Sequence, residues 1–584
     1  MLNQLRLRLA GIDALPQLAA LGLLSGVLAG AVIIAFRLVI EQTQMAFLPG
    51  GGTENYESLS AGMRFLLPTA GGLIIGLIFH RINSLGGGGV QVGVVHVLER
   101  LAYYQGHLPL RNFILQFVGA GISLISGHSV GREGPGVHLG AASGSLLGQW
   151  LHLPNNSIQT LVACGAAASI AASFNTPIAG VIFAMEVIMM EYTIAGFAPV
   201  ILAAVSATAL TRFVFGDAPA FAVPTLQLAS LYELPYLLLM GLVIGALAAA
   251  FISGLKWLTT ASSQIVIWQR LTLAGALTGL CALLVPEIMG VGYDTVNQAL
   301  LGQLGMGLLL MVVLFKLLAT TIGLGLGLPG GLIGPTLVIG AAAGGLLGLL
   351  AEAIFPGQVA SPGFYAMLGM GAMMGATLQA PLAALLAMLE LTANPNIILP
   401  GMLAVVASGI TSSHLFRCES VFLSLLKLRG LDYRSDPVMQ SLRRTGVASV
   451  VNTAFVQTTR YIRRTSAEQL VAQHPEWIVV AEPTESDERP VAALLLAADL
   501  ALFLRSPAAS ESTENASIDL LEIPAQRENI APISAQATLH QALELMNEKG
   551  IDALCVTVSR RNQADDIIGI VSRQTVESHY RSVG

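Results

Sequence analysis

The sequence predicts an α-helical polytopic membrane protein with two related halves, followed by a soluble α/β domain. Hydrophobic residues make up 54% of its 584 residues and charged residues only 11%, whereas a soluble domain averages roughly 25% charged residues. Two apolar segments, beginning at residues 134 and 334, repeat each other. The composition then changes sharply near residue 428. These observations indicate the environment, the internal symmetry and the domain boundary.

Several apolar runs approach or reach the roughly 20 residues that a helix needs to cross a bilayer. They lie near residues 17–40, 62–80, 234–258, 269–287 and 333–352. Shorter runs, interrupted by Gly and Pro, lie around residues 112–130, 157–192 and 363–391. Broken segments are tolerated in a membrane only where protein buries the freed backbone groups or a cavity hydrates them. The pattern therefore favours a transporter or a channel.

The N-terminus and the cysteines add two further expectations. Arg6 and Arg8 precede the first apolar run, which favours a cytoplasmic N-terminus by the positive-inside rule. That run is too long, and lacks the cleavage context, for a removed signal peptide. The four cysteines form no CxxC pair, so we expect neither a disulfide framework nor a metal site.

After residue 428 the chain becomes charged, as in "KLRGLDYRSDPVMQSLRRTG", and contains short β-rich runs such as "WIVVAEP" and "ALCVTVS". This pattern indicates a soluble α/β domain. The polar stretch "SPAASESTENAS" (506–517) is typical of a linker and divides the tail in two. The sequence thus predicts a membrane domain over 1–428, then modules over 429–505 and 518–584.

The repeat inside the membrane domain is specific. "GPGVHLGAASGSLLG" (134–148) matches "GPTLVIGAAAGGLLG" (334–348) at nine of fifteen positions. "TPIAGVIFAME" (176–186) likewise matches "APLAALLAMLE" (380–390), each with a Glu nine residues after a Pro. Repeats with broken helices are typical of secondary transporters, whose substrate lies where half-helix N-termini converge.

Each repeated block opens with Gly-Pro at an expected helix start, where the missing N–H of proline costs nothing. Unpaired N–H groups and the positive dipole end would then face the cavity, forming an anion site without a fixed positive side chain. A cation pathway should instead show rings of Asp or Glu. Acidic residues are few in this part of the sequence, so an anion is the favoured substrate.

Four segments resemble the signature segments of the CLC chloride channel and transporter family. They are "GREGPGVHLG" (131–140), "LFKLLATTIGLGLGLPGG" with the following "LIGPTLVIG" (314–340), "APLAALLAMLELT" (380–392) and, in divergent form, "LGGGGVQVG" (85–93). The resemblance covers about residues 15–430. It implies the CLC fold, with two inverted halves of about 15–215 and 230–428, and a homodimer whose subunits each hold an anion pathway.

The tail resembles a pair of CBS domains. "AALLLAADLALF" (492–503) and "IIGIVSRQTVES" (567–578) are similar to the ends of two such modules. In the first, Asp499 stands at the position of the acid that commonly holds a ribose, and in the second Thr575 stands there. The resemblance implies a candidate adenine-nucleotide site at Asp499 and Thr575. A purely structural or dimerising pair is the alternative.

The resemblance assigns the gate to Glu133, whose carboxylate would imitate an anion in the outer binding site. A carboxylate at a helix N-terminus is stabilised by N–H groups and the dipole, and a competing anion seeks the same donors. The alternative is a simple helix cap paired with Arg132. The further anion contacts implied are Gly131, Arg132 and Gly134 around the gate, and Leu332, Ile333 and Gly334 through backbone N–H groups.

Three departures from the family pattern bear on mechanism. Gly88 stands where the family carries a serine that contacts the central anion, so chloride preference is less secure. Phe422 stands where the family carries a tyrosine, so a hydroxyl donor is lost. Val187 occupies the position of the inner glutamate that passes protons in exchangers. Glu191, expected one helical turn further, is a candidate replacement in the proton pathway with Glu133.

Other titratable groups near these segments have structural interpretations. Glu186 and Glu390 are repeat partners, and we expect both to support structure. His128 and His138 each lie five residues from Glu133 in the sequence and can tune its protonation, because histidine titrates near neutral pH. A packed or lipid-interface role is the alternative for both histidines.

We therefore expect passive, channel-type chloride transport gated by Glu133, in a plasma (inner) membrane, with the N-terminus and the CBS pair in the cytoplasm. The alternative is chloride/proton antiport with an atypical proton path. No metal, required cofactor or nucleic acid is expected. A cation transporter would need paired midplane acids. An enzyme would need a nucleophile and base or a metal cluster at membrane depth, and the sequence contains no HExxH motif.

Overall fold

The computed structural model describes residues 6, 9, 14–85, 89–192, 194–218, 221, 227–431, 437–481, 491–506, 517–560 and 563–581. These residues form two compact units. The helical unit comprises Leu18–Trp150 and Ile158–Arg434. The tail unit comprises the described residues of Met1–Gln17, Leu151–Ser157 and Ser435–Gly584. The division near residue 434 lies close to the composition change at residue 428.

The helices of the first half are α2 (Leu15–Phe47), α3 (Ala61–Ser84), α4 (Gly93–Tyr103), α5 (Leu110–Ile125), α6 (Glu133–Trp150), α7 (Asn155–Phe174), α8 (Pro177–Phe183) with its π-helical extension η3 (Ala184–Met189), and α9 (Ile194–Phe215). Those of the second half are α10 (Leu234–Ala261), α11 (Ile267–Leu284), α12 (Tyr293–Leu300), α13 (Met306–Gly325), α14 (Ile333–Ile354), α15 (Pro362–Leu378), α16 (Pro381–Thr392), α17 (Ile398–Ile410) and α18 (Val421–Leu428).

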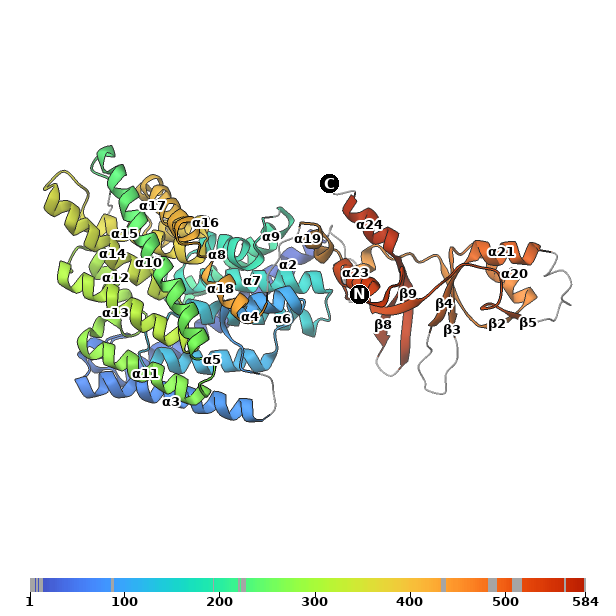
Figure 1. Cartoon of the computed structure of the whole chain (residues 1–584), viewed down its shortest axis with the longest axis horizontal. Helices are drawn as coiled ribbons and strands as arrows, with labels where there is room; N and C mark the ends of the chain where they lie inside the picture. The colour runs from blue at the N-terminus through green and yellow to red at the C-terminus, as the bar shows by residue number, and fades with distance from the viewer. Residues whose placement is uncertain are drawn as a thin grey trace. The chain divides into compact units, whose positions relative to one another are not determined.

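Within the described residues, nine helices are long and apolar enough to cross a membrane. Shorter apolar helices accompany them, including α5, α8 with η3, and α16. Each of the pair α8 and α16 begins at a proline, as the sequence predicts for broken segments. Figure 1 shows how closely neighbouring helices pack, for example α3 along α11. The fold is therefore the predicted polytopic bundle of long and broken helices.

Glycine contacts recur in both halves and show the repeat in three dimensions. In the first half, a methyl group added to Gly165 of α7 would lie 1.9 Å from the carbonyl oxygen of Gly140 in α6. In the second half, a methyl group on Gly369 of α15 would lie 2.2 Å from the carbonyl oxygen of Gly340 in α14. Both helix pairs approach so closely that only glycine fits. The two repeated sequence blocks thus fold into the same packing.

The tail unit contains two strand–helix–strand–strand–helix modules. The first is built from β1 (Phe455–Thr459), α20 (Arg464–Ala472), β3 (Trp477–Ala481), β4 (Val491–Leu496) and α21 (Ala497–Arg505), and the second from β7 (Ile530–Ser534), α23 (Leu539–Lys549), β8 (Ala553–Arg560), β9 (Gln563–Ser572) and α24 (Arg573–Arg581). One sheet has the order β1-β3-β4-β6, with β6 at Arg527–Glu528, and another the order β7-β8-β9. The repeated order matches the predicted pair of modules.

Two segments cross the predicted boundaries between these modules. Strand β5 (Ser517–Asp519) pairs antiparallel with β2 (Tyr461–Arg463), so the first module continues past the predicted linker. Helix α19 (Pro437–Arg444) precedes the first module in sequence. Its Leu442, with the nearby Val447, lies in the hydrophobic core of the second module. Composition could not show this exchange because both cores contain the same aliphatic residue types.

Candidate functional site

The two halves of the helical unit meet at a pair of glycines. The N–H of Gly131 donates to the carbonyl of Gly331, and the N–H of Gly331 donates back to Gly131, both at 2.7 Å. Helices α6 and α14 begin shortly after, at Glu133 and Ile333. A methyl group on Gly134 would lie 2.7 Å from the Cα of Gly331. The N-terminal ends of two helices, one from each half, are thereby held together.

Glu133 is fully buried, and its carboxylate bonds across to the other half. Its Oε2 accepts the N–H of Gly334, in the first turn of α14, at 3.1 Å. Its Oε1 accepts the hydroxyl of Tyr293. The free N–H groups and the positive dipole end of a helix stabilise a negative charge here. Glu133 thus caps the facing helix, while the neighbouring Arg132 pairs with Glu41 at 3.4 Å.

Tyr293 belongs to the site, although no motif in the sequence points to it. It is the first residue of α12, and its ring centroid lies 5.5 Å from that of Phe221 and 6.1 Å from that of Phe174. The only local signal is the glycine turn before it, where Gly292 has φ +86° and precedes a helix start. Nothing in one sequence links this turn to Glu133, 160 residues away.

A buried lysine fixes the turn that leads to Tyr293. Lys316 of α13 is fully buried, and its Nζ donates to the carbonyl oxygens of Ile288 and Gly290, both at 2.9 Å. A buried charge is stable only when its donors are satisfied in this way. The ammonium group therefore anchors the chain just before α12, which positions the tyrosine hydroxyl against Glu133.

The remaining predicted anion contacts have mixed outcomes. Leu332 is the N-cap of α14 and Ile333 its first residue, so their N–H groups lie where a helix offers unpaired donors. Phe422 of α18 is buried in the same hydrophobic core as Leu332 and Ile333. Gly88 lies outside the described residues. The roles of all these residues in anion binding stay predictions.

The two histidines flanking Glu133 in sequence bond to other groups. His138 Nε2 lies 2.9 Å from Nδ1 of His96 in α4, and the two rings stack. His128 Nδ1 lies 2.9 Å from the hydroxyl of Ser126. Both His128 and His138 are fully buried. These contacts favour the packed, structural interpretation for both histidines.

The repeat partners Glu186 and Glu390 cap each other's helices. The Glu186 carboxylate, at the end of the α8 segment, accepts the N–H of Leu382 (3.3 Å) and Ala383 (2.8 Å) at the start of α16. The Glu390 carboxylate, near the end of α16, accepts the N–H of Ile178 (3.1 Å) and Ala179 (2.8 Å) at the start of α8. The predicted supporting role is thus visible as a reciprocal pair of helix caps.

The proposed replacement for the inner acid lies differently from the expectation. Val187 is buried in η3, with 5% of its surface exposed. The helical segment ends at Met189, and Met190 has a left-handed backbone with φ +53°. Glu191 therefore follows the helix end and is not one helical turn from Val187. The sequence pattern did not predict this helix end because no glycine or proline stands there.

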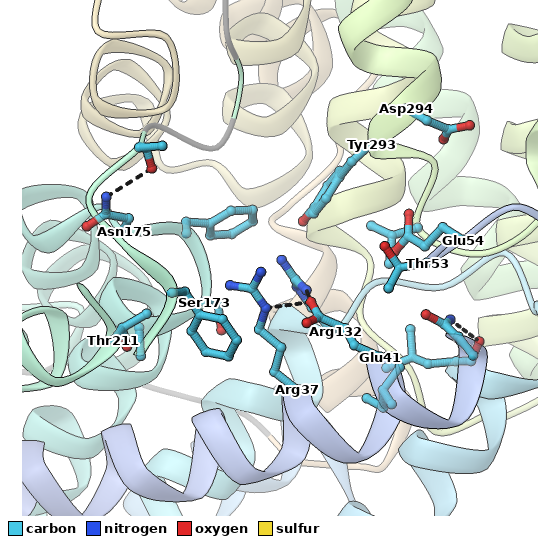
Figure 2. Close-up of a pocket in the computed structure, with 18 of the residues that line it drawn as sticks. Arg37, Glu41, Thr53, Glu54, Arg132, Ser173, Asn175, Thr211, Tyr293 and Asp294 are labelled. Carbon is cyan, nitrogen blue, oxygen red and sulfur yellow. Dashed lines mark hydrogen bonds and ion pairs between the residues drawn. The ribbon is translucent and has the colours of Figure 1, made fainter. Parts of the chain in front are cut away.

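A cavity of about 420 Å³ lies beside Glu133. Its lining includes Arg132, which precedes Glu133 in the sequence, and Tyr293, which donates to Glu133. Arg37 and Glu41 of α2 also line it. Figure 2 shows Arg37, Glu41 and Arg132 meeting near its centre, with Tyr293 next to them. The Arg132 guanidinium also lies 5.4 Å from the centre of the Tyr293 ring. The cavity thus reaches Tyr293, whose hydroxyl donates to the Glu133 carboxylate.

In the tail unit, both predicted nucleotide residues have bonds within the chain. Asp499, in the first turn of α21, accepts the backbone N–H of Gln526 at 3.0 Å. The hydroxyl of Thr575 lies 2.9 Å from that of Ser572. The first bond joins the start of α21 to a backbone group 27 residues away, and the second lies at the start of α24. Their part in nucleotide binding stays a prediction.

The geometry defines a class: a multi-span membrane protein of two repeated halves that meet, helix start to helix start, at one buried carboxylate. The sequence matches the voltage gated chloride channel family over residues 71–413. The chain belongs to that family. It also matches the CBS domain over residues 522–580, which is the second tail module.

Individual relatives agree with this placement. A ClcB-like protein of Ralstonia nicotianae, whose name describes a chloride channel, is 35% identical over 408 residues, covering 68% of this chain and 94% of its own. The H(+)/Cl(−) exchange transporter ClcA of Vibrio cholerae is 31% identical, covering 53% of this chain and 68% of its own. The crystal structure of a slow cyanobacterial Cl−/H+ antiporter shares the fold, with a TM-score of 0.62 at 22% identity, covering 71% of this chain and 98% of the other.

Proposed function

We propose that the protein carries chloride or another small anion across a membrane by a passive, channel-type pathway gated by Glu133. The observation that carries the proposal is the position of the Glu133 carboxylate. It comes from one half and accepts the N–H of Gly334 at the helix start of the other half, at 3.1 Å. Helix N-termini are ready anion sites. A side chain that occupies those donors competes directly with a transported anion.

The gate works by exchange of one negative charge for another. In the closed state the carboxylate is held by the Gly334 N–H and the Tyr293 hydroxyl. An arriving anion takes over these donors, together with the N–H groups of Leu332 and Ile333, and the carboxylate leaves. The donors are fixed by the fold, so they need no rearrangement to receive the anion. Conduction is then the transfer of a dehydrated anion along donors at helix starts.

Chloride/proton antiport is the second candidate. Relatives named H(+)/Cl(−) exchange transporters favour it. In this chain the inner position is the apolar Val187, and Glu186 is engaged in a helix cap. A proton reaching Glu133 would therefore need water or another acid such as Glu191. The channel-type pathway requires no such route and is the simpler reading of these residues.

We further propose that the protein works as a homodimer in the plasma (inner) membrane, with its N-terminus and CBS pair in the cytoplasm. Family membership supports the dimer, and Arg6 and Arg8 before the first apolar run support the orientation. An adenine nucleotide at the CBS pair remains a prediction for Asp499 and Thr575. Equilibrium dialysis of the full chain with ATP checks it.

The decisive experiment uses purified protein in liposomes that contain a chloride gradient. Chloride efflux and external pH are recorded together, for the native protein and for Glu133→Ala. Chloride flux without proton movement, altered in its dependence on pH and chloride by Glu133→Ala, is the expected result. Uphill proton movement driven by chloride and abolished in the variant would establish antiport instead. If neither folded protein carried chloride, the assignment of chloride as the substrate would be wrong.

A further inference from the structure

The cavity beside Glu133 has two arginines near its centre, one of them from a helix that does not carry the gate. We name it the arginine cavity; its lining includes Arg37, Glu41, Arg132, Ser173, Thr211 and Tyr293. Arg37 and Glu41 come from α2, whereas Arg132 directly precedes the gate. Glu54 and Asp294 also line the cavity, and Figure 2 shows them on the side away from Arg37. The side near Arg37 is polar but uncharged apart from the two arginines and Glu41.

Two guanidinium groups share a single carboxylate oxygen. The Nε of Arg37 lies 2.5 Å from Oε1 of Glu41, and the Nη1 of Arg132 lies 3.4 Å from the same atom. Glu133 and Glu54 also interact electrostatically with Arg132, so the cluster is a mixed one in which two guanidinium groups compete for carboxylates. The Arg37 guanidinium also lies 3.9 Å from the centre of the Phe215 ring, which holds its plane in a fixed orientation.

Donors in this cluster remain for a ligand. A guanidinium carries five N–H groups in a planar fork. The Nε of Arg132 is buried, and the described residues provide no hydrogen-bond acceptor for it. The hydroxyl of Thr211, a residue only 3% exposed, also has no partner within the described part of the chain. Buried donors without acceptors are uncommon in folded proteins, and both residues belong to the lining of the cavity.

We propose that Arg37 and Arg132 form a second anion-binding site in the arginine cavity, before the Glu133 gate. Its ligand is a small monovalent anion, a halide or a planar oxyanion such as nitrate. The Glu41 carboxylate is the internal competitor there, as Glu133 is at the helix starts. An anion at Arg132 stands next to the Tyr293 hydroxyl that holds the gate closed. The effect of the bound anion on the gate rests on the proposed function, whereas anion binding by the two arginines does not.

The test combines anion binding with flux, using the full chain. Crystals soaked in bromide should give an anomalous peak between Arg37 and Arg132, stronger in Glu41→Gln and missing in Arg37→Gln. In liposomes the half-saturating chloride concentration should rise about threefold to tenfold in Arg37→Gln and fall by a similar factor in Glu41→Gln, with maximal flux retained.

Arg212→Gln is the matched control. Arg212 is exposed, bonds to Asn175 at 2.7 Å and does not line the cavity. Its loss should shift half-saturation less than about twofold, because exposed charges are screened. An equal shift of the half-saturating chloride concentration in Arg212→Gln and Arg37→Gln would mean that any nearby positive charge attracts the anion. That result would overturn the proposed binding site. So would bromide density that avoids both arginines in the native protein and in Glu41→Gln.

A structural salt bridge makes a different prediction for the same variants. It predicts lower thermal stability in both Arg37→Gln and Glu41→Gln, with half-saturation unchanged, and that result overturns the site. If Arg37→Gln does not fold, Arg37→Lys keeps the charge without the fork and should give an intermediate shift. Bromide at the arginines of a protein that carries no chloride would keep this site and overturn the proposed transport instead.

Discussion

The two halves of the helical unit share a backbone arrangement and differ in two side chains at their junction, where Arg132 and Glu133 face Leu332 and Ile333. Gly131 and Gly331 hold equivalent places and exchange paired hydrogen bonds. Two positions later the first half carries Glu133 and the second carries Ile333, both buried. The symmetric backbone brings two helix starts together, which suits an anion. The asymmetric carboxylate turns that place into one that a protein side chain can occupy.

On the proposed function, this difference means that anion binding and gating have separate origins in this fold. N–H groups at helix starts are backbone features, so either half can supply them without a particular side chain. A gate needs a negative charge of its own, and only the first half provides it. Where symmetry is complete, as for Glu186 and Glu390, the acids serve the scaffold. The comparison therefore predicts symmetric effects for scaffold variants and one-sided effects for gate variants.

The largest expected effect is destabilisation of the folded protein by Gly165→Ala and by Gly369→Ala. Each methyl group would lie within 2.2 Å of a backbone oxygen on the neighbouring helix, so the helices must separate. Overpacking of this kind costs about 1–3 kcal/mol or more. Thermal unfolding in detergent should show both variants destabilised alike.

Gly409→Ala in α17 is the control for this pair, because its methyl group would meet nothing within 4 Å. Its unfolding temperature should stay close to the native value. If one of Gly165→Ala and Gly369→Ala were tolerated and the other not, the two helix pairs would not be equivalent in energy, and the symmetry would be limited to backbone shape.

A smaller, one-sided effect is expected for Tyr293→Phe. The substitution keeps the ring near Arg132 and removes the hydroxyl that donates to Glu133. A hydrogen bond to a charged group contributes about 1.5 kcal/mol or more, and a 1.4 kcal/mol change is about tenfold in affinity. The half-saturating chloride concentration for flux should therefore fall roughly tenfold.

Tyr365→Phe is the matched control, since Tyr365 also donates its hydroxyl to a buried glutamate, Glu233, away from the gate. It should change thermal stability but leave the chloride dependence of flux unchanged. An unchanged chloride dependence in Tyr293→Phe would mean that the Gly334 N–H alone holds the carboxylate, and that the tyrosine only fills space.

The sequence predicted the scaffold well because its signals are local. Span length, Gly-Pro helix starts and the repeated blocks at residues 134 and 334 each depend on neighbouring residues. The site was only partly predictable because its contacts join distant segments. Glu133 stands in a specific motif, but Tyr293 reaches it from 160 residues away. The end of the α8 segment at Met189 depends on a left-handed Met190, which no residue type announces.

The smallest expected effect tests the symmetric pair Glu186 and Glu390. Replacement of either by Gln keeps an oxygen acceptor for the facing helix start and removes the charge that favours the dipole. A capping charge contributes about 0.3–1 kcal/mol, so Glu186→Gln and Glu390→Gln should each lower the unfolding temperature slightly and by similar amounts.

The effect of these two variants on transport distinguishes a structural role of the carboxylates from a role in a proton pathway. Glu186 precedes Val187, so it is the acid nearest the position that exchangers of the family use for protons. If both carboxylates are only caps, the two variants leave chloride flux and external pH traces equal to the native protein. If Glu186→Gln alone changes proton movement while Glu390→Gln does not, the first half carries a second functional acid. The asymmetry between the halves would then extend from Glu133 to the far end of the α8 segment.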